Sequence, residues 1–249
     1  MKFFSPLEQF MIHPIIKINF LNLFDISLTN NTLSIIVAMG SFIFLSYFFT
    51  YKIALLPYAT QIFGEILYFF IFNIVFNQVG FKGLQYFPLI FTTFNFILFC
   101  NLLGLIPFNF TATAQIMQLF TLSLSFILSF VIIGFLRHKI GFLKLFVPKN
   151  VPIFLVPLIV VVEVLSYCLR PISLSVRLFA NMLAGHTLLH IIAGFGIKII
   201  KKSFIIGIIP FIFIMAIICL ELAIAFIQAY VFTMLITIYL NESIQEIGH

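Results

Sequence analysis

Ionisable side chains inside long apolar segments are the candidates for chemistry in this sequence. The segment 152–200 carries Glu163, Arg170, Arg177 and His186, and the segment 204–241 carries Glu221. Each such residue at membrane depth costs about 2.5–3.5 kcal/mol even on a lenient insertion scale. One of them alone could be a paired structural residue or one that reaches the interface. Several together indicate an ion pathway.

The first set follows helical spacing. Glu163, Arg170 and Arg177 are seven residues apart, so they drift only about 20° per step around a helix. Asn181 lies one turn beyond Arg177 on the same face. Pro171 can kink this helix, which makes the alignment approximate. We therefore predict one polar face on the helix.

A second polar face follows in the last segment. Gln228 follows Glu221 by seven residues and Glu242 follows Gln228 by fourteen, so all three fall on one helix face. The rise from Glu221 to Glu242 is about 31 Å on a helix, roughly one hydrocarbon thickness. Small residues such as Gly185 and Ala225 also favour close helix approach. Two polar faces on neighbouring helices predict a path for an ion.

Metal binding is the competing chemistry. His186 and His190 stand at i and i+4, a spacing that can place two imidazoles on one helix face as ligands of a metal ion. No nearby Glu or Cys completes a known ligand motif, and His186 points almost opposite to Arg177. We expect no metal and no cofactor, and no nucleophile or nucleotide-binding motif is present.

Composition sets the class of protein. Hydrophobic residues make up 63% of the 249 residues and charged residues only 8%, against roughly 25% charged in a soluble domain. The net charge of +6 comes from basic residues between apolar runs, where they set topology or contact lipid head groups. We therefore predict a membrane protein that does not bind nucleic acid.

The apolar runs predict an all-α integral membrane protein of about six helices in a single membrane domain, 1–249. We expect a tilted helical hairpin at the C-terminus, because a helix over the last segment would measure roughly 55 Å against a bilayer core of about 30 Å. Gln61 and Glu65, one turn apart, favour a helix lying on the membrane. The predicted parts are an arm at 1–31, a span at 32–50, an amphipathic helix at 57–80, spans at 87–106 and 116–136, and long helices at 152–200 and 204–241.

Loop charges predict the orientation. Lys52 and Lys82 flank the second segment, and the 137–149 loop is basic, whereas the 107–115 loop is neutral. The positive-inside rule places the basic loops on the cytoplasmic or matrix side.

Three runs resemble subunit a of F-type ATP synthases. They are RPISLSVRLFANMLAGH from Arg170, NLLGLIPFNFTATAQ from Asn101 and ELAIAFIQAYVFTMLITIYLNE from Glu221. SPLEQF at Ser5 is similar to the arm of the mitochondrial version. The resemblance implies a stator subunit with two proton half-channels, which couples proton flow to rotation of a c-ring and so to ATP synthesis. It implies no enzyme activity for the chain alone, and the mitochondrial inner membrane as its location.

The resemblance also implies roles for single residues. Arg177 matches the essential arginine that faces the ring and separates the half-channels. His186 and Glu221 match a pair near the intermembrane-space channel, in the mitochondrial assignment rather than the exchanged bacterial one. The other matching positions lie close to the arginine (Asn181, Gln228), at the matrix-side channel (Glu163, Glu242) or in supporting places (Arg170, Asn101).

These roles agree with the chemistry of the residue types. Arginine stays cationic, so it favours the ionised form of a rotor carboxylate and repels protons. Glu and His can exchange protons near neutral pH. The partners implied are the c-ring, the peripheral stalk and other membrane-sector subunits, protons, and membrane lipids with cardiolipin one candidate.

Two other classes of protein are alternatives to this interpretation. An ion-coupled secondary transporter would show internal repeats and broken helices, and no repeat is visible. A structural subunit of the respiratory chain would not need Arg177 between Glu163 and His186 in apolar sequence.

Overall fold

The computed structural model describes residues 10–17, 19–20, 24–25, 27–51, 57–106, 109–139, 141–142, 155–200 and 204–244. Most of the run at Ser5 and much of the basic 137–149 loop lie outside these residues, as does Lys52.

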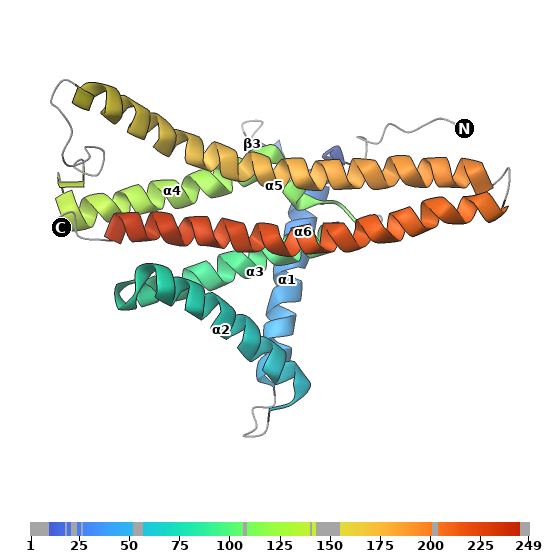
Figure 1. Ribbon diagram of the computed structural model, residues 1–249, viewed down its shortest axis with the longest axis horizontal. Coiled ribbons are helices and arrows are strands. Elements are labelled where there is room, and N and C mark those ends of the chain that lie inside the picture. Colours follow the sequence, from blue (N-terminus) through green and yellow to red (C-terminus); the bar gives the residue numbers. More distant parts are fainter. Residues whose placement is uncertain are drawn as a thin grey trace. The chain divides into compact units, whose positions relative to one another are not determined.

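Six long helices account for most of the described chain (Figure 1). Each is long and apolar enough to cross a membrane, so the prediction of an all-α, multi-pass membrane protein is confirmed. The helix at 59–79 is also long and apolar enough to cross a membrane, and its location on the membrane surface stays a prediction. The helices are α1 (Asn30–Thr50), α2 (Ala59–Val79), α3 (Phe87–Gly104), α4 (Ile116–His138), α5 (Val156–Ile200) and α6 (Phe204–Ile244).

Local sequence explains where the first two helices begin and end. Thr29 caps α1, because its Oγ1 accepts a hydrogen bond from the Thr32 backbone N–H at 3.3 Å, while Thr32 Oγ1 accepts from the Thr29 N–H at 3.0 Å. Gly80 ends α2 in the left-handed region at φ 69°, which glycine adopts without steric cost. The 3₁₀ helix η2 (Phe81–Tyr86) then leads directly into α3.

The arm before α1 holds two short antiparallel pairings that the sequence did not predict. β1 (Pro14–Ile16) pairs with β4 (Leu28–Thr29), and β2 (Asn19–Phe20) pairs with β3 (Phe24–Asp25). Asn30 ties the arm to the helix, since its Nδ2 donates to the Met11 carbonyl at 3.0 Å.

The chain divides into two compact units. Unit 1 holds residues 1–52, 95–116 and 178–230, and unit 2 holds 53–94, 117–177 and 231–249. Helices α3, α5 and α6 contribute to both. Buried residues of unit 1 include Ile97, Leu178, Met182 and Ala225, and those of unit 2 include Ile71, Phe94, Phe130, Phe232 and Ile236.

The two long C-terminal helices run antiparallel in unit 1, as the predicted hairpin requires. Gly185 of α5 meets Glu221 of α6, and further along α5 an ideal Cβ on Gly196 would lie 3.2 Å from Pro210. In unit 2, α5 continues through Pro171. There Ser123 of α4 donates from Oγ to the Pro171 carbonyl at 3.0 Å, which ties α4 to α5.

Candidate functional site

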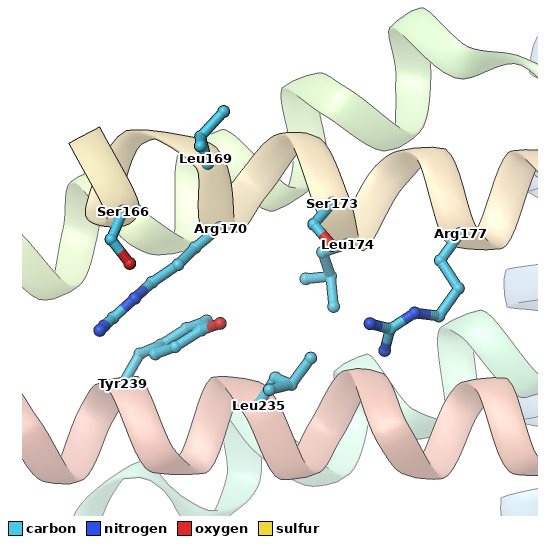
Figure 2. Close-up of a pocket in the computed structure, with 8 residues that line it drawn as sticks. All are labelled: Ser166, Leu169, Arg170, Ser173, Leu174, Arg177, Leu235 and Tyr239. Carbon is cyan, nitrogen blue, oxygen red and sulfur yellow. The ribbon is translucent and has the colours of Figure 1, made fainter. Parts of the chain in front are cut away.

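Arg170 and Arg177 line one open pocket of about 230 Å³ in unit 2 (Figure 2). Both side chains leave α5 on the side that faces α6, as their seven-residue spacing predicts. Tyr239 and Leu235 of α6 form the opposite wall. The remaining lining residues come from α5: Ser166, Leu169, Ser173 and Leu174.

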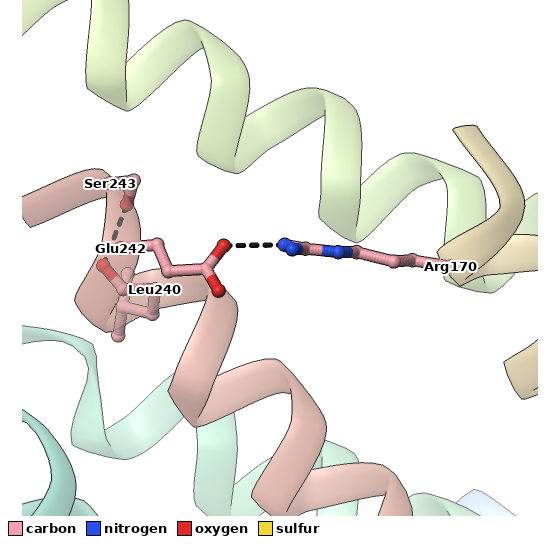
Figure 3. A network of polar contacts seen from close by, with 4 residues as sticks. All are labelled: Arg170, Leu240, Glu242 and Ser243. Atoms are coloured by element: carbon pink, nitrogen blue, oxygen red, sulfur yellow. Dashed lines mark hydrogen bonds and ion pairs between the residues drawn. The ribbon is translucent and has the colours of Figure 1, made fainter. Parts of the chain in front are cut away.

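Arg170 is held by three contacts. Its Nη1 donates to Glu242 Oε2 in a hydrogen-bonded ion pair (Figure 3). Its guanidinium carbon lies 4.9 Å from the Tyr167 ring centroid and 4.8 Å from that of Tyr239. A planar guanidinium suits both a carboxylate and aromatic faces. The side chains of the ion pair are only 20% and 32% exposed, so both charges are largely withdrawn from solvent or lipid.

Arg177 has different surroundings. Its side chain is exposed, and within the described part of the chain it forms no hydrogen bond or ion pair. Since arginine keeps its charge, Arg177 presents a permanent cation to the pocket without a counter-charge from the described residues. The same pocket therefore holds one compensated guanidinium and one uncompensated guanidinium.

Glu221 and His186 lie in unit 1, but no hydrogen bond joins them. Glu221 is 6% exposed, and its carboxylate packs against Gly185, the residue before His186. Both Glu221 oxygens and His186 Nε2 are buried without a hydrogen-bond partner among the described residues. The ring of Phe10 packs edge-on against His186, with centroids 6.3 Å apart. The predicted pair is thus brought near one glycine without a direct bond.

Asn101 connects α3 to α6 in unit 1. It is fully buried, and its Nδ2 donates to the Ala225 carbonyl at 3.3 Å; its supporting role stays a prediction. Its Oδ1 has no partner among the described residues. Just before α4, Gln115 Nε2 donates to the Phe10 carbonyl at 2.8 Å and so ties the arm to this part of unit 1.

The other predicted positions do not line the Arg177 pocket. Asn181 and Gln228 are half-buried residues of unit 1, and Glu163 is half-buried on α5, two turns before Arg170. Over the residues that the structure describes, no three His, Cys, Asp or Glu side chains form a group that could hold a metal ion.

Tyr167 and Tyr239 are site residues that the sequence analysis missed. Each lies three residues before a charged member of the ion pair, Tyr167 before Arg170 and Tyr239 before Glu242. Residues at i and i+3 share a helix face, so this spacing was a usable signal for an aromatic clamp. Phe10 gave no such signal, because its contact with His186 depends on the path of the arm.

Comparison with known proteins identifies the family. The profile of the family described as ATP synthase A chain matches residues 32–241. ATP synthase subunit a of Acanthamoeba castellanii is 45% identical over 240 residues, which cover 96% of this chain and 97% of the relative. The subunit a of Bartonella quintana is 44% identical over 251 residues and 98% of each chain. That of Wolbachia from Drosophila simulans is 39% identical over 97% of this chain and 99% of its own length. Neither the transporter nor the respiratory-chain alternative finds support among these matches, and the chain belongs to the ATP synthase A chain family.

Proposed function

We infer that this chain is the proton-channel stator subunit in the membrane sector of an F-type ATP synthase. It provides two proton half-channels that couple transmembrane proton flow to rotation of a c-ring and so to ATP synthesis. The observation that carries the residue-level proposal is the exposed guanidinium of Arg177, which faces an open pocket beside the compensated Arg170. In this proposal the chain has no enzymatic activity of its own.

Arg177 acts as the barrier and the rotor contact. A rotor carboxylate must give up its proton to pass the stator, and a nearby guanidinium favours the ionised form of that carboxylate. Because Arg177 cannot release its own proton, it also repels protons that would leak directly between the half-channels. The membrane potential contributes about 2.3 kcal/mol per charge per 100 mV to the movement.

The remaining pathway residues fall into two groups. His186 and Glu221 serve the intermembrane-space half-channel, and Asn181 and Gln228 are further polar pathway residues, at the positions that the family resemblance assigns near the arginine. Glu163 and Glu242 serve the matrix half-channel, where Arg170 holds the Glu242 carboxylate in a fixed position. The burial of Glu221 without a partner among the described residues supports this assignment, because a carboxyl group that takes up and releases protons must stay open to new partners.

We place the subunit in the mitochondrial inner membrane, with the c-ring, the peripheral stalk, other membrane-sector subunits and lipids such as cardiolipin as partners. The amoebal relative supports this location, as does the presence of His at 186 and Glu at 221. Fractionation of the source cells tests the location, since we expect the chain in the inner-membrane fraction. Recovery from a bacterial or plasma-membrane fraction would refute it.

Proton flux in liposomes that hold the intact complex tests the function. We expect Arg177→Ala to abolish ATP-driven pumping with the complex still assembled, and to add a passive leak under an imposed potential. Arg137→Ala is the matched control, because Arg137 is exposed in the last turn of α4, and it should pump like the wild type. Normal coupled pumping by Arg177→Ala would refute the assignment of Arg177.

A further inference from the structure

Besides Asn31 Oδ1 near the start of α1, six polar atoms in unit 1 are buried without a hydrogen-bond partner among the described residues. Four of the side chains that carry these atoms are almost fully buried. Asn101 of α3 is 0% exposed, Thr111 and Thr113 of the α3–α4 connection are 3% exposed, and Glu221 of α6 is 6% exposed. Leaving such atoms unpaired is costly, and most buried polar atoms in folded proteins bond to protein or water. The six atoms are Asn101 Oδ1, Thr111 Oγ1, Thr113 Oγ1, His186 Nε2, Glu221 Oε1 and Glu221 Oε2.

Contacts between these elements bring Asn101, Thr111, Glu221 and the helix turn that carries His186 to one region. Asn101 of α3 bonds to Ala225 of α6, which stands one turn after Glu221. Glu221 in turn packs against Gly185 of α5. The four elements α3, α5, α6 and the α3–α4 connection are thus linked around a common interior, and each of them contributes at least one of the six atoms.

The α3–α4 connection closes this set of contacts. An ideal Cβ on Gly104, one turn after Asn101, would lie 3.1 Å from Thr111 Cγ2 and 3.7 Å from Met182 Cε. Met182 stands one turn before His186 on α5. Thr113 follows two residues after Thr111 in the 3₁₀ helix η3 (Ala112–Ala114), whose three residues are all buried and which packs against α1.

The atom types suit water better than any other ligand. A hydroxyl both donates and accepts a hydrogen bond, and an amide oxygen accepts. Buried waters in proteins typically make about three hydrogen bonds to groups that would otherwise be unsatisfied. Neutral hydroxyl and amide groups offer no counter-charge to a metal ion or an anion. Among the residues that contribute the six atoms, the carboxylate is Glu221, which the proposed function already uses.

We propose that Thr111, Thr113 and Asn101 hold bound water that carries protons between the α3–α4 connection and the Glu221–His186 site. This inference rests on the proposed function and extends it to residues outside the two long helices. Each hydroxyl accepts a hydrogen bond from one water and donates to the next, so a proton can pass without a charged side chain at Thr111 or Thr113.

Threonine-to-valine variants of the intact complex in liposomes test the role of the hydroxyls. Valine keeps the shape of the side chain and removes the hydroxyl. We expect Thr111→Val/Thr113→Val to lower ATP-driven proton flux roughly 100-fold, the low end of the loss caused by removing a positioned proton-transfer group. Thr111→Ser/Thr113→Ser keeps both hydroxyls and should restore most of the flux.

Thr92→Val is the matched control. Thr92 is exposed on α3 and its hydroxyl donates to the Leu89 carbonyl of its own helix at 2.9 Å, so its loss should leave the flux unchanged. Flux in the double valine variant equal to that of Thr92→Val would overturn the inference. The proposed function would then still stand on the Arg177→Ala result, and its own failure would appear as normal pumping by that variant.

A cryo-EM map of the wild-type complex that resolves water decides the case even if the valine variants fail to assemble. We expect water density at about 2.7–3.0 Å from both threonine hydroxyls. Hydroxyls bonded to protein groups, with no water beside them, would overturn the inference.

Discussion

Gly185→Ala is a small perturbation aimed at one carboxylate. An ideal Cβ at this position would lie 2.9 Å from Glu221 Cδ and 3.2 Å from Cγ, and it would overlap a carboxylate oxygen. Carbon atoms in contact stay about 3.5–4.0 Å apart, so the Glu221 carboxyl group must move by roughly 1 Å. The obstructing atoms are at the end of a flexible side chain, so the helices themselves can stay in place.

The expected result is a complex that assembles but pumps poorly. A displacement of about 1 Å in a catalytic geometry can lower a rate roughly 100-fold, and an overpacked site typically costs about 1–3 kcal/mol. We therefore expect ATP-driven proton flux in liposomes to fall between about tenfold and 100-fold. Gly194→Ala is the control on the same helix, because no atom of the described residues lies within 4 Å of its ideal Cβ, apart from its chain neighbours and the adjacent backbone of its own helix. There alanine should leave flux unchanged and favour the helix by up to about 1 kcal/mol.

A second-site variant separates displacement from general damage. Glu221→Asp shortens the acid by one methylene group and retracts it from Gly185. Adding Gly185→Ala to Glu221→Asp should therefore cost much less flux than adding it to the wild type. Wild-type flux in Gly185→Ala would refute the reasoning, as would equal losses in both backgrounds.

Two further predictions concern unit 2. Arg170→Gln and Glu242→Gln should each destabilise the intact complex. A double-mutant cycle of thermal stability should give a coupling energy of about 1.5–3 kcal/mol for the charge-assisted hydrogen bond. Additive losses of stability would show that the two side chains do not interact. Ser123→Ala removes one hydrogen bond to the Pro171 carbonyl and should lower the stability of the complex by only about 0.6 kcal/mol in the same assay. Proton flux should stay unchanged, and a large loss of flux would contradict a purely structural role of Ser123.

Much of the fold could be predicted because hydrophobicity marks the helices directly. The uncharged runs at 32–50, 87–106 and 116–136 correspond to α1, α3 and α4. Helix α1 begins at Asn30 instead of Thr32, because Thr29 provides the cap. Helix α6 continues to Ile244, since nothing in the Glu242–Ser243 sequence breaks a helix. The strand pairings of the arm could not be predicted from their few residues, because two-residue strands carry no periodicity.

The site could be predicted only where one helix determines it. Arg170 and Arg177 share a pocket because α5 continues through Pro171 and preserves the heptad spacing. The Arg170–Glu242 pair joins residues 72 positions apart, so it depends on the register between α5 and α6. In unit 1 the contact of Glu221 with Gly185 likewise depends on how the two helices pair. No periodicity within either helix contains that information.

The ion pair also explains how one pocket can hold two arginines for which different roles are proposed. An incoming carboxylate would be attracted to any uncompensated guanidinium. Glu242 already neutralises Arg170, and Tyr167 and Tyr239 hold the Arg170 guanidinium in place. Within the described residues, the pocket's uncompensated positive charge is therefore that of Arg177. We infer that the acid at position 242 decides which of the two arginines is available to a rotor carboxylate.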